Sequence, residues 1–513
     1  MKTPAGNSEK MIDSHFTAHS MYIPSILILL ILSIPAASNE LRVKNMYELF
    51  PFPPLDVKST VYISNEAIPR YPRHFIGPSQ WLDIKHHVFS GRTPTGTLTL
   101  LFAGSGTGTS TILLCNQLRQ HNIKFTAVHF DLSSASVAIA KKRAIETGHT
   151  NIKFIQGSLL NEKDMLRVKN DGPFDYIDCV GVLMATVNAS KALHNLKTVL
   201  SSRGGIGIMV YATFGRAPIY QIRRTMQLLT QGNRNVTRKD QLLMLRKLLK
   251  DEGNHWSRVS NLGIHADDYD DVTLVDTYLH PVDRSYTIPE TFELIHDAGL
   301  VFRSFTCPLL YDASTIPNMN SNVLSANEIH GWSGELNDVE RYELAENFDG
   351  TLERHEFYVV HNNTQRRIQS IVDSPDMELV LRIPVLYFKQ TILATLRTIG
   401  RLVVPATEVG HRERVIQIPE HINHRNLHRV AQQINGTRTT SGSILQTLRE
   451  KSTWSGKNDA KRLLCKEYKA QFLALEWLGV AMVHCGYAVV HVKETSDDLM
   501  ESWEHSEHFR DCY

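Results

Sequence analysis

The chain has 513 residues, of which 42% are apolar and 21% are charged. This composition supports one large globular domain or two to three ordinary ones. The 55 basic and 53 acidic residues leave a formal net charge of +2, so nothing indicates nucleic acid as the main partner. Six cysteines occur without a Cys-x-x-Cys pair, and we therefore expect neither a metal site nor a disulfide framework.

Residues 1–40 read as an N-terminal appendage. An apolar run spans residues 23–34, and the small residues of Pro35–Ser38 follow it. This pattern is typical of a secretory signal, and the run is shorter than the roughly 20 residues of a membrane span. A signal, a weak membrane tether through residues 23–34 and a dispensable appendage remain the three interpretations.

Residues 41–95 are expected to form an N-terminal strap or cap. The stretch Asn45–Pro54 is rich in aromatic residues and proline. Prolines favour an extended backbone that can lie across another domain. The segment is therefore either a plain linker or a strap over a functional site.

A glycine-rich turn follows the next apolar run. Residues 98–103 read as a buried strand, Gly104, Gly106 and Gly108 follow, and residues 111–118 read as a helix. Bare backbone N–H groups and a positive helix end suit an anionic or electron-rich ligand. The spacing differs from the dinucleotide fingerprint, and Thr109 stands where a phosphate-binding loop requires lysine.

Strands alternate with helices over the following hundred or so residues. The expected strands cover residues 125–130, 152–155, 174–179 and 205–211. This order predicts an α/β fold with a mostly parallel sheet and helices on both faces. Ligands of such sheets bind at the carboxyl ends of the strands, where Gly104, Asp131, Ser158 and Asp178 are expected.

Asp131 is the second informative residue. It ends the second expected strand, where a carboxylate can accept hydrogen bonds from both ribose hydroxyls of an adenosine. The alternative is that Asp131 only caps the helix that follows. The glycine turn, the acid and the strand order together favour a nucleoside ligand.

At this point the chain resembles the class I S-adenosylmethionine-dependent methyltransferases, and specifically a bacterial-type group of uncharacterised members. The resemblance covers about residues 47–360. Its motifs are Tyr47-Glu-Leu-Phe-Pro-Phe-Pro-Pro, Leu101-Phe-Ala-Gly-Ser-Gly-Thr-Gly108, Phe130-Asp-Leu-Ser133, Asn151-Ile-Lys-Phe-Ile-Gln-Gly-Ser158, Phe174-Asp-Tyr-Ile-Asp-Cys-Val-Gly-Val-Leu183, Val210-Tyr-Ala-Thr-Phe-Gly-Arg216 and Leu279-His-Pro-Val-Asp-Arg-Ser-Tyr-Thr287.

The resemblance implies a Rossmann-like, doubly wound, seven-stranded sheet with an antiparallel last strand over residues 96–361, and residues 356–360 would be one of the two closing strands. It also implies S-adenosylmethionine as cofactor and a small molecule or a protein as methyl acceptor. The implied cofactor-binding residues are Ala103, Gly104, Ser105, Gly106, Gly108, Asp131, Leu132, Ser158, Leu159, Asp178, Cys179 and Val180.

The catalytic candidates are His280, Asp283 and Tyr286. His280 with Asp283 or Tyr286 could deprotonate a hydroxyl or amine nucleophile, and Asp178 is a further candidate base. The alternative is that His280 only starts a loop and that Arg284 makes a structural ion pair. Methyl transfer does not require a general base, because the cofactor supplies the electrophile.

Two departures from the family pattern stand out. Met184–Ala185 replace the usual His-His, and Ser158 replaces an Asp that often contacts the adenine amine. We expect cofactor binding to survive, because hydroxyl and backbone groups still form hydrogen bonds. A catalytically inactive, cofactor-binding regulatory or scaffold protein is the alternative function.

Two further segments have less definite readings. Residues 219–252 are expected to be helical, with Arg223, Arg224, Arg234, Arg238 and Lys239 forming either a substrate cover or a solvated face. Residues 375–495 resemble a small, mainly α, winged-helix-like module with a partner-binding or substrate-presenting role. Because the cofactor is made in the cytosol, we expect a cytoplasmic catalytic domain. The sequence does not indicate an oligomeric state.

Overall fold

The computed structural model describes the chain from residue 39 onward, with gaps. The described residues are 39–54, 80–231, 236–250, 270–315, 329, 331, 333–361, 377–381, 401–404, 414–418, 422, 424–434, 438–451, 471, 474–475, 478, 481 and 488–492. The signal-like segment of residues 1–38 lies outside them. Within these ranges, no helix is both long and apolar enough to cross a membrane.

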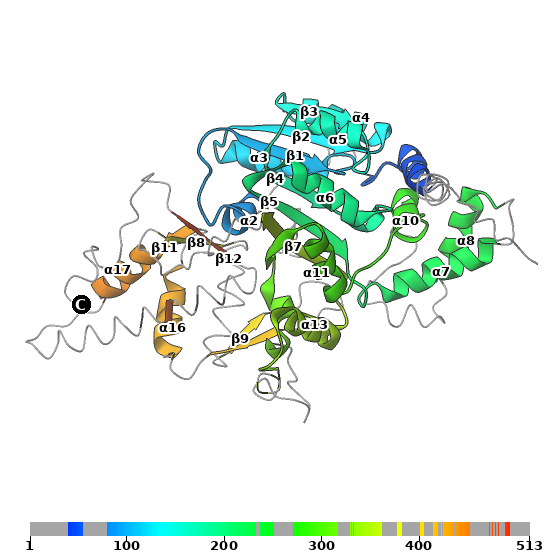
Figure 1. Ribbon diagram of the computed structural model, residues 1–513. Helices are drawn as coiled ribbons and strands as arrows, with labels where there is room; N and C mark the ends of the chain where they lie inside the picture. Colours follow the sequence, from blue (N-terminus) through cyan, green and yellow to red (C-terminus); the bar gives the residue numbers. More distant parts are fainter. Residues whose placement is uncertain are drawn as a thin grey trace, which may run out of the picture.

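A seven-stranded sheet forms the centre of the fold (Figure 1). Its strands are β1 (Leu98–Ala103), β2 (Phe125–Asp131), β3 (Ile152–Gln156), β4 (Phe174–Val180), β5 (Leu200–Tyr211), β6 (Leu300–Phe305) and β7 (Arg354–His361). Their order is β3-β2-β1-β4-β5-β7-β6. β1 to β5 pair in parallel, and β7 pairs antiparallel with both β5 and β6. The predicted Rossmann-like sheet is confirmed.

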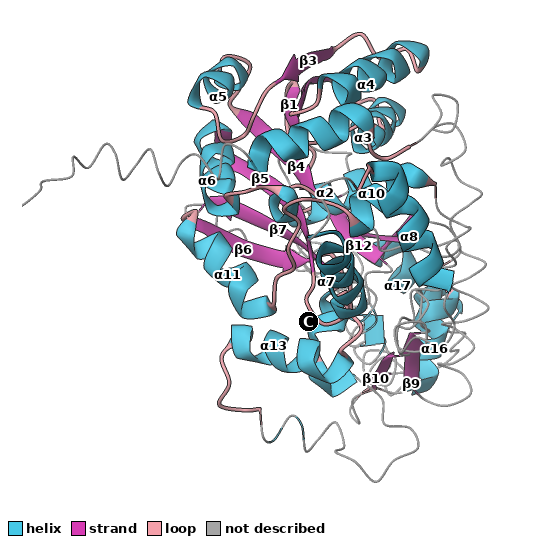
Figure 2. Cartoon of the chain, turned by 90° about the vertical axis from the view of Figure 1, so that its right-hand side faces the viewer, coloured by secondary structure: helices cyan, strands magenta, loops and turns pink. Residues whose placement is uncertain are grey.

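Helices cover both faces of this sheet (Figure 2). α2 (Gln80–His87), α3 (Thr109–Gln120) and α4 (Ser134–Glu146) lie on one face; α5 (Glu162–Lys169), α6 (Ala189–Val199) and α11 (Ile288–Asp297) lie on the other, with α13 (Asp338–Asp349) beyond.

The apolar core is double because the side chains of β1 alternate between two layers. Leu100 and Phe102 pack with α2 and α3, whereas Leu101 and Ala103 belong to the core that contains α6 and α11. Successive residues of a strand point to opposite faces, so one apolar strand can serve both layers.

α2 packs into the core of the seven-stranded sheet and not into a separate cap. Trp81 is 2% exposed and Ile84 is fully buried, and both pack against β1 and α3. A domain boundary at residue 95 would therefore divide one apolar core. The helical pattern of this segment was too short to show which domain it packs against.

A helical insert follows β5. It consists of α7 (Ala217–Gln231), α8 (Arg238–Lys250) and α10 (Asp271–Tyr278), and it packs against the helix at residues 39–49 (Figure 1). Arg223 is buried and is not part of an exposed basic face. Arg224, Arg238 and Lys239 are exposed, and Arg234 lies outside the described residues.

The C-terminal part combines small sheets with helices. β8 (Met377–Leu381) lies between β11 (Arg438–Thr440) and β12 (Ala488–Val492), and β9 (Arg401–Val404) pairs with β10 (Arg414–Gln417). α16 (His424–Gln432) and α17 (Ser441–Lys451) are helices of this part. The strands β8, β9, β11 and β12 depart from the mainly α content predicted for residues 375–495. The winged-helix-like assignment stays a prediction.

Candidate functional site

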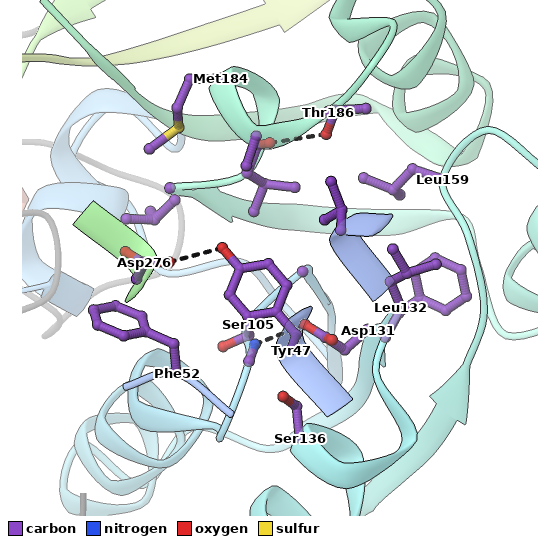
Figure 3. A pocket seen from close by; sticks show the side chains of 18 of the residues that line it. Tyr47, Phe52, Ser105, Asp131, Leu132, Ser136, Leu159, Met184, Thr186 and Asp276 are labelled. Atoms are coloured by element: carbon purple, nitrogen blue, oxygen red, sulfur yellow. Dashed lines mark hydrogen bonds between the residues drawn. The ribbon is translucent and has the colours of Figure 1, made fainter. Parts of the chain in front are cut away.

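A cavity of about 280 Å³ lies at the carboxyl ends of the parallel strands (Figure 3). Most of the predicted cofactor-binding residues line it: Gly104, Ser105, Gly106, Asp131, Leu132, Ser158, Leu159, Asp178 and Val180. Ala103, Gly108 and Cys179 do not. The ends of four strands that are distant in sequence, β1 to β4, therefore converge where sheets of this type bind ligands.

The three residues that do not line the cavity support it from behind. Ala103 and Cys179 are buried in the apolar core below it. Gly108 has a φ of +89°, and a Cβ at this position would lie 2.8 Å from the Cβ of Ala140. Gly108 therefore allows α3 to pack closely on α4.

The glycine turn is held by backbone contacts. Gly104 N donates to Phe130 O at 2.7 Å, and Thr107 N donates to Phe52 O at 3.0 Å. Gly106 has a φ of +52°, and an added Cβ would lie 2.2 Å from Phe52 O. A side chain at position 106 would therefore collide with the backbone of the segment that covers the turn.

Asp131 projects into the cavity and braces its wall. Its carboxylate accepts hydrogen bonds from Gly106 N at 2.8 Å and Ser133 N at 2.9 Å. Burial raises the pKa of Asp131 to about 6, although the same two N–H groups lower it. Ser133, and not Asp131, caps α4, because its side chain accepts from Ser136 N. The carboxylate is therefore positioned for a ligand.

Asp178 lies deeper in the same cavity. Its Oδ2 accepts from Gln80 Nε2 at 2.8 Å and from Ser110 Oγ at 2.9 Å. Burial raises its pKa to about 7, and these two hydrogen bonds act in the opposite direction. Gln80, at the start of α2, gave no sequence signal.

The segment at residues 39–54 covers the cavity, and we call it the strap. Phe52 and Pro53 line the cavity. The Glu48 carboxylate accepts from Ser134 N at 2.8 Å and Ala135 N at 2.9 Å. Its contacts with the glycine turn and α4 favour the strap interpretation over a plain linker.

A second polar group lines the cavity where the strap meets α10 (Asp271–Tyr278), and we call this region the acceptor end. Tyr47 OH donates to Asp276 Oδ1 at 2.9 Å (Figure 3). Burial raises the pKa of Asp276 to about 6, and the Tyr47 hydroxyl lowers it. Asp276 comes from α10, and His280 and Asp283 follow that helix and line the same cavity.

His280 is held as a neutral hydrogen-bond donor. Its Nδ1 accepts from Val282 N at 3.1 Å and Asp283 N at 2.9 Å, so the ring proton lies on Nε2. Nε2 is buried and has no hydrogen-bond partner in the described part of the chain. Burial, with the charge of Arg223, lowers the pKa of His280 to about 3. This tautomer suits donation to a ligand and not proton abstraction.

Asp283 forms a buried ion pair. Its Oδ2 lies 3.0 Å from Arg223 Nη1 and accepts from Tyr220 OH at 3.3 Å. Burial raises its pKa, opposed by the charges of Arg223 and Arg216. This pairing fixes the shape of the acceptor end.

Tyr286 does not line the cavity. It is 3% exposed within the apolar core, and its N–H donates to Tyr211 O at 2.8 Å. The Arg284 guanidinium lies over its ring, and Arg284 also pairs with Glu290 at 2.9 Å. The structural alternative for Arg284 therefore describes this segment better.

Met184 and Ala185 form part of the cavity wall, in the short 3-10 turn η2 (Leu183–Ala185). The departure from the family's His-His thus makes this wall apolar.

Sequence reasoning missed several other lining residues. They are Glu40, Val43, Thr109, Ser110, Thr186, Val187, Met209, Tyr211 and Asp276. The aromatic and proline-rich pattern identified the strap, but no pattern distinguished Asp276 from a surface acid of an amphipathic helix. Among the described residues, no group of three His, Cys, Asp or Glu side chains could hold a metal ion.

The residues fit an adenosyl cofactor. Added Cβ atoms at Gly104 and Gly106 would lie 2.6 Å and 2.2 Å from neighbouring atoms, so the turn presents bare backbone to the cavity. The Asp131 carboxylate lies directly beside the turn, because it accepts from Gly106 N at 2.8 Å, and Leu132 and Leu159 supply an apolar wall.

Comparisons with known proteins agree with this geometry. Residues 96–258 match a family model described as "Methyltransferase domain". An uncharacterized protein of Synechococcus sp. is 27% identical over 321 residues, which cover 62% of this chain and 70% of that protein. PKMT2 from Rickettsia typhi, solved alone and in complex with AdoHcy, is 16% identical with a TM-score of 0.54, over 83% of this chain and 76% of that one. Residues 96–258 therefore carry an S-adenosylmethionine-dependent methyltransferase domain, and the fold is similar to that of PKMT2.

Proposed function

We propose that this methyltransferase transfers the methyl group of S-adenosylmethionine to an amine nitrogen of a small molecule or a protein side chain. The observation that carries the proposal is the Asp276 carboxylate at the acceptor end. Asp276 lines the cavity, whereas the charge of the neighbouring Asp283 is already paired with Arg223. Asp276 is held by the Tyr47 hydroxyl, so its negative charge is available to a cationic group.

The cofactor end holds and orients the reacting group. Gly104 and Gly106 present backbone, and Asp131 offers a carboxylate suited to ribose hydroxyls. When bound, S-adenosylmethionine supplies an electrophilic methyl group on its sulfonium. The strap covers this end and excludes water. Positioning of this kind contributes roughly 7–11 kcal/mol to a bimolecular step.

The acceptor end prepares the nucleophile. Asp276, with a pKa of about 6, is ionised at neutral pH and attracts a protonated amine. An amine must lose a proton before its lone pair can attack, and Asp276 is placed to take it. The buried Nε2–H of His280 donates a hydrogen bond to a neighbouring oxygen of the acceptor molecule.

The experiment is a transfer assay with radiolabelled S-adenosylmethionine. A cell extract and a panel of amines, amino acids and proteins are incubated with the purified chain and with Asp276→Asn. We expect a labelled product with the methyl group on nitrogen, formed much more slowly by the variant. A product methylated on oxygen, sulfur or carbon would overturn the amine assignment. Binding of S-adenosylhomocysteine without any labelled product would instead support the inactive regulatory or scaffold protein.

A further inference from the structure

An acidic side chain from the strap reaches the cofactor end of the cavity. Glu40 lies in the helix at residues 39–49 and lines the cavity. Its Oε1 accepts a hydrogen bond from the hydroxyl of Ser158, 118 positions away in the chain. A carboxylate has two oxygens and about four acceptor sites, and the Ser158 hydroxyl uses one site of Oε1. Glu40 can therefore also accept a hydrogen bond from a donor on a ligand in the cavity.

Ser158 has little capacity left for a ligand. Its hydroxyl donates to Glu40 and accepts from Leu160 N at 3.0 Å, while its own N–H donates to Asp164 Oδ2 at 3.0 Å. In the loop after β3, the proton of the Ser158 hydroxyl is therefore already used in the hydrogen bond to Glu40. Glu40 is the acid beside this position.

The surroundings of Glu40 suit a flat heteroaromatic ring. Leu132 and Leu159 lie together beside Asp131 (Figure 3), and Val43 of the strap and Phe130 of β2 also line the cavity. A purine buried between apolar side chains must still satisfy its polar edge. The exocyclic amine of a purine bound here needs a hydrogen-bond acceptor. Glu40, which lies beside Ser158, is a carboxylate that can supply one.

We propose that the Glu40 carboxylate accepts a hydrogen bond from the exocyclic amine of the cofactor's adenine. The inference rests on the proposed function, because it concerns the same cofactor. Adenine recognition then comes from the strap and not from the loop after β3. The strap must lie closed before the cavity can distinguish adenine from a 6-oxopurine.

Two acids on the strap helix separate this role from simple anchoring. Glu48 does not line the cavity and is engaged by Ser134 N and Ala135 N at the start of α4. Loss of an anchor weakens every ligand that the closed strap covers. Loss of an adenine acceptor weakens only ligands that carry the amine.

The test is calorimetric binding of S-adenosylhomocysteine and S-inosylhomocysteine, in which a carbonyl oxygen replaces the amine. Both are measured on the full chain, Glu40→Gln, Glu48→Gln and, as an exposed neighbour, Leu41→Ala. We expect the unmodified chain to bind the adenosyl compound at least about tenfold more tightly, as expected for a hydrogen bond to a charged group. In Glu40→Gln this preference should fall to within about twofold, because an amide can donate to the 6-oxo group.

The controls assign each outcome. Glu48→Gln should weaken both ligands alike and keep the preference, and Leu41→Ala should change neither affinity. A full preference retained in Glu40→Gln would overturn the adenine role and leave the cofactor assignment standing. Failure of the unmodified chain to bind S-adenosylhomocysteine would overturn the proposed function and this inference together. Thermal melting without ligand confirms that each variant is folded.

Discussion

The two ends of the cavity are built in different ways. The cofactor end consists mostly of loops at the carboxyl ends of adjacent parallel strands, and it presents backbone together with the carboxylates of Asp131 and Glu40. The acceptor end brings Tyr47 of the strap to Asp276 of α10, 229 positions apart. In our proposal the cofactor lies at the carboxyl ends of the strands, while the strap and the helical insert form the acceptor end. Acceptor chemistry can therefore change without altering the cofactor end.

The largest expected effect is a loss of kcat from a substitution that changes the acceptor end alone. Asp276→Asn removes the proton acceptor but keeps the shape of the side chain, so kcat should fall by roughly 10²–10⁴-fold. Affinity for S-adenosylhomocysteine should stay within about twofold. Asp271→Asn, an exposed acid on the same helix, is the control. An equal loss of cofactor affinity in Asp276→Asn would show that the two ends are not separate.

The next largest effect is a loss of cofactor affinity from a substitution in the glycine turn of the cofactor end. Gly106→Ala places a Cβ 2.2 Å from Phe52 O and should weaken S-adenosylhomocysteine binding by roughly 100-fold, because the turn or the strap must shift. Gly96→Ala is a matched control, since Gly96 also has a positive φ, of +89°, but no atom within 4 Å of the added Cβ. Calorimetry should find normal affinity for the control. Equal losses in both variants would show that backbone strain, and not the contact with the strap, sets the affinity.

A third test measures how the ionisation of Asp178 changes the free energy of unfolding. Burial raises the pKa of Asp178 to about 7, so the folded chain holds this proton more tightly than the unfolded chain. Its favourable contribution is complete below about pH 4 and is lost as the pH rises through about 7. Asp178→Asn should therefore stabilise the ligand-free chain at pH 8 by on the order of 2 kcal/mol, with little effect at pH 4.

Urea unfolding at the two pH values measures this difference. Thr99→Ser is a conservative control, because Thr99 lies near the start of β1 and the cavity lies at the other end of that strand. Equal stability of Asp178→Asn and the unmodified chain at pH 8 would mean that Asp178 pays no ionisation penalty in the folded state.

The smallest expected effect concerns the contact between the strap and α10. Tyr47 OH lowers the pKa of Asp276, so Tyr47→Phe should raise that pKa. The acidic limb of the kcat profile, near pH 6, should then move to higher pH by about half a unit or more. Tyr220→Phe is the control, because Tyr220 bonds Asp283 instead. If the acidic limb of the kcat profile stays at the same pH in Tyr47→Phe, Asp276 is not the group whose ionisation controls kcat.

The two ends also differ in how well sequence reasoning predicted them. Gly104, Gly106 and Asp131 lie at or just after the ends of two strands, and local patterns were enough to predict that they line the same site. Gln80 and Asp276 reach the cavity only through the tertiary packing of helices. A short pattern carries no information about such contacts.

Tyr286 shows the opposite error. Its motif resembled a segment close to substrate, but the ring is buried in the core beneath Arg284. The sheet order followed from alternating strands and helices, and the sequence did not show that α2 belongs to the same core. An amphipathic helix reveals that one face is buried, but not which partner covers it.

The most direct test of the whole account is calorimetric titration of S-adenosylhomocysteine into the unmodified chain and Asp131→Ala. Asp131 braces Gly106 N and Ser133 N and is proposed to hold the ribose hydroxyls. The account predicts binding to the unmodified chain and affinity roughly 100-fold weaker in the variant, as expected for loss of hydrogen bonds to a charged group. Equal affinities, or no binding to either protein, would contradict it.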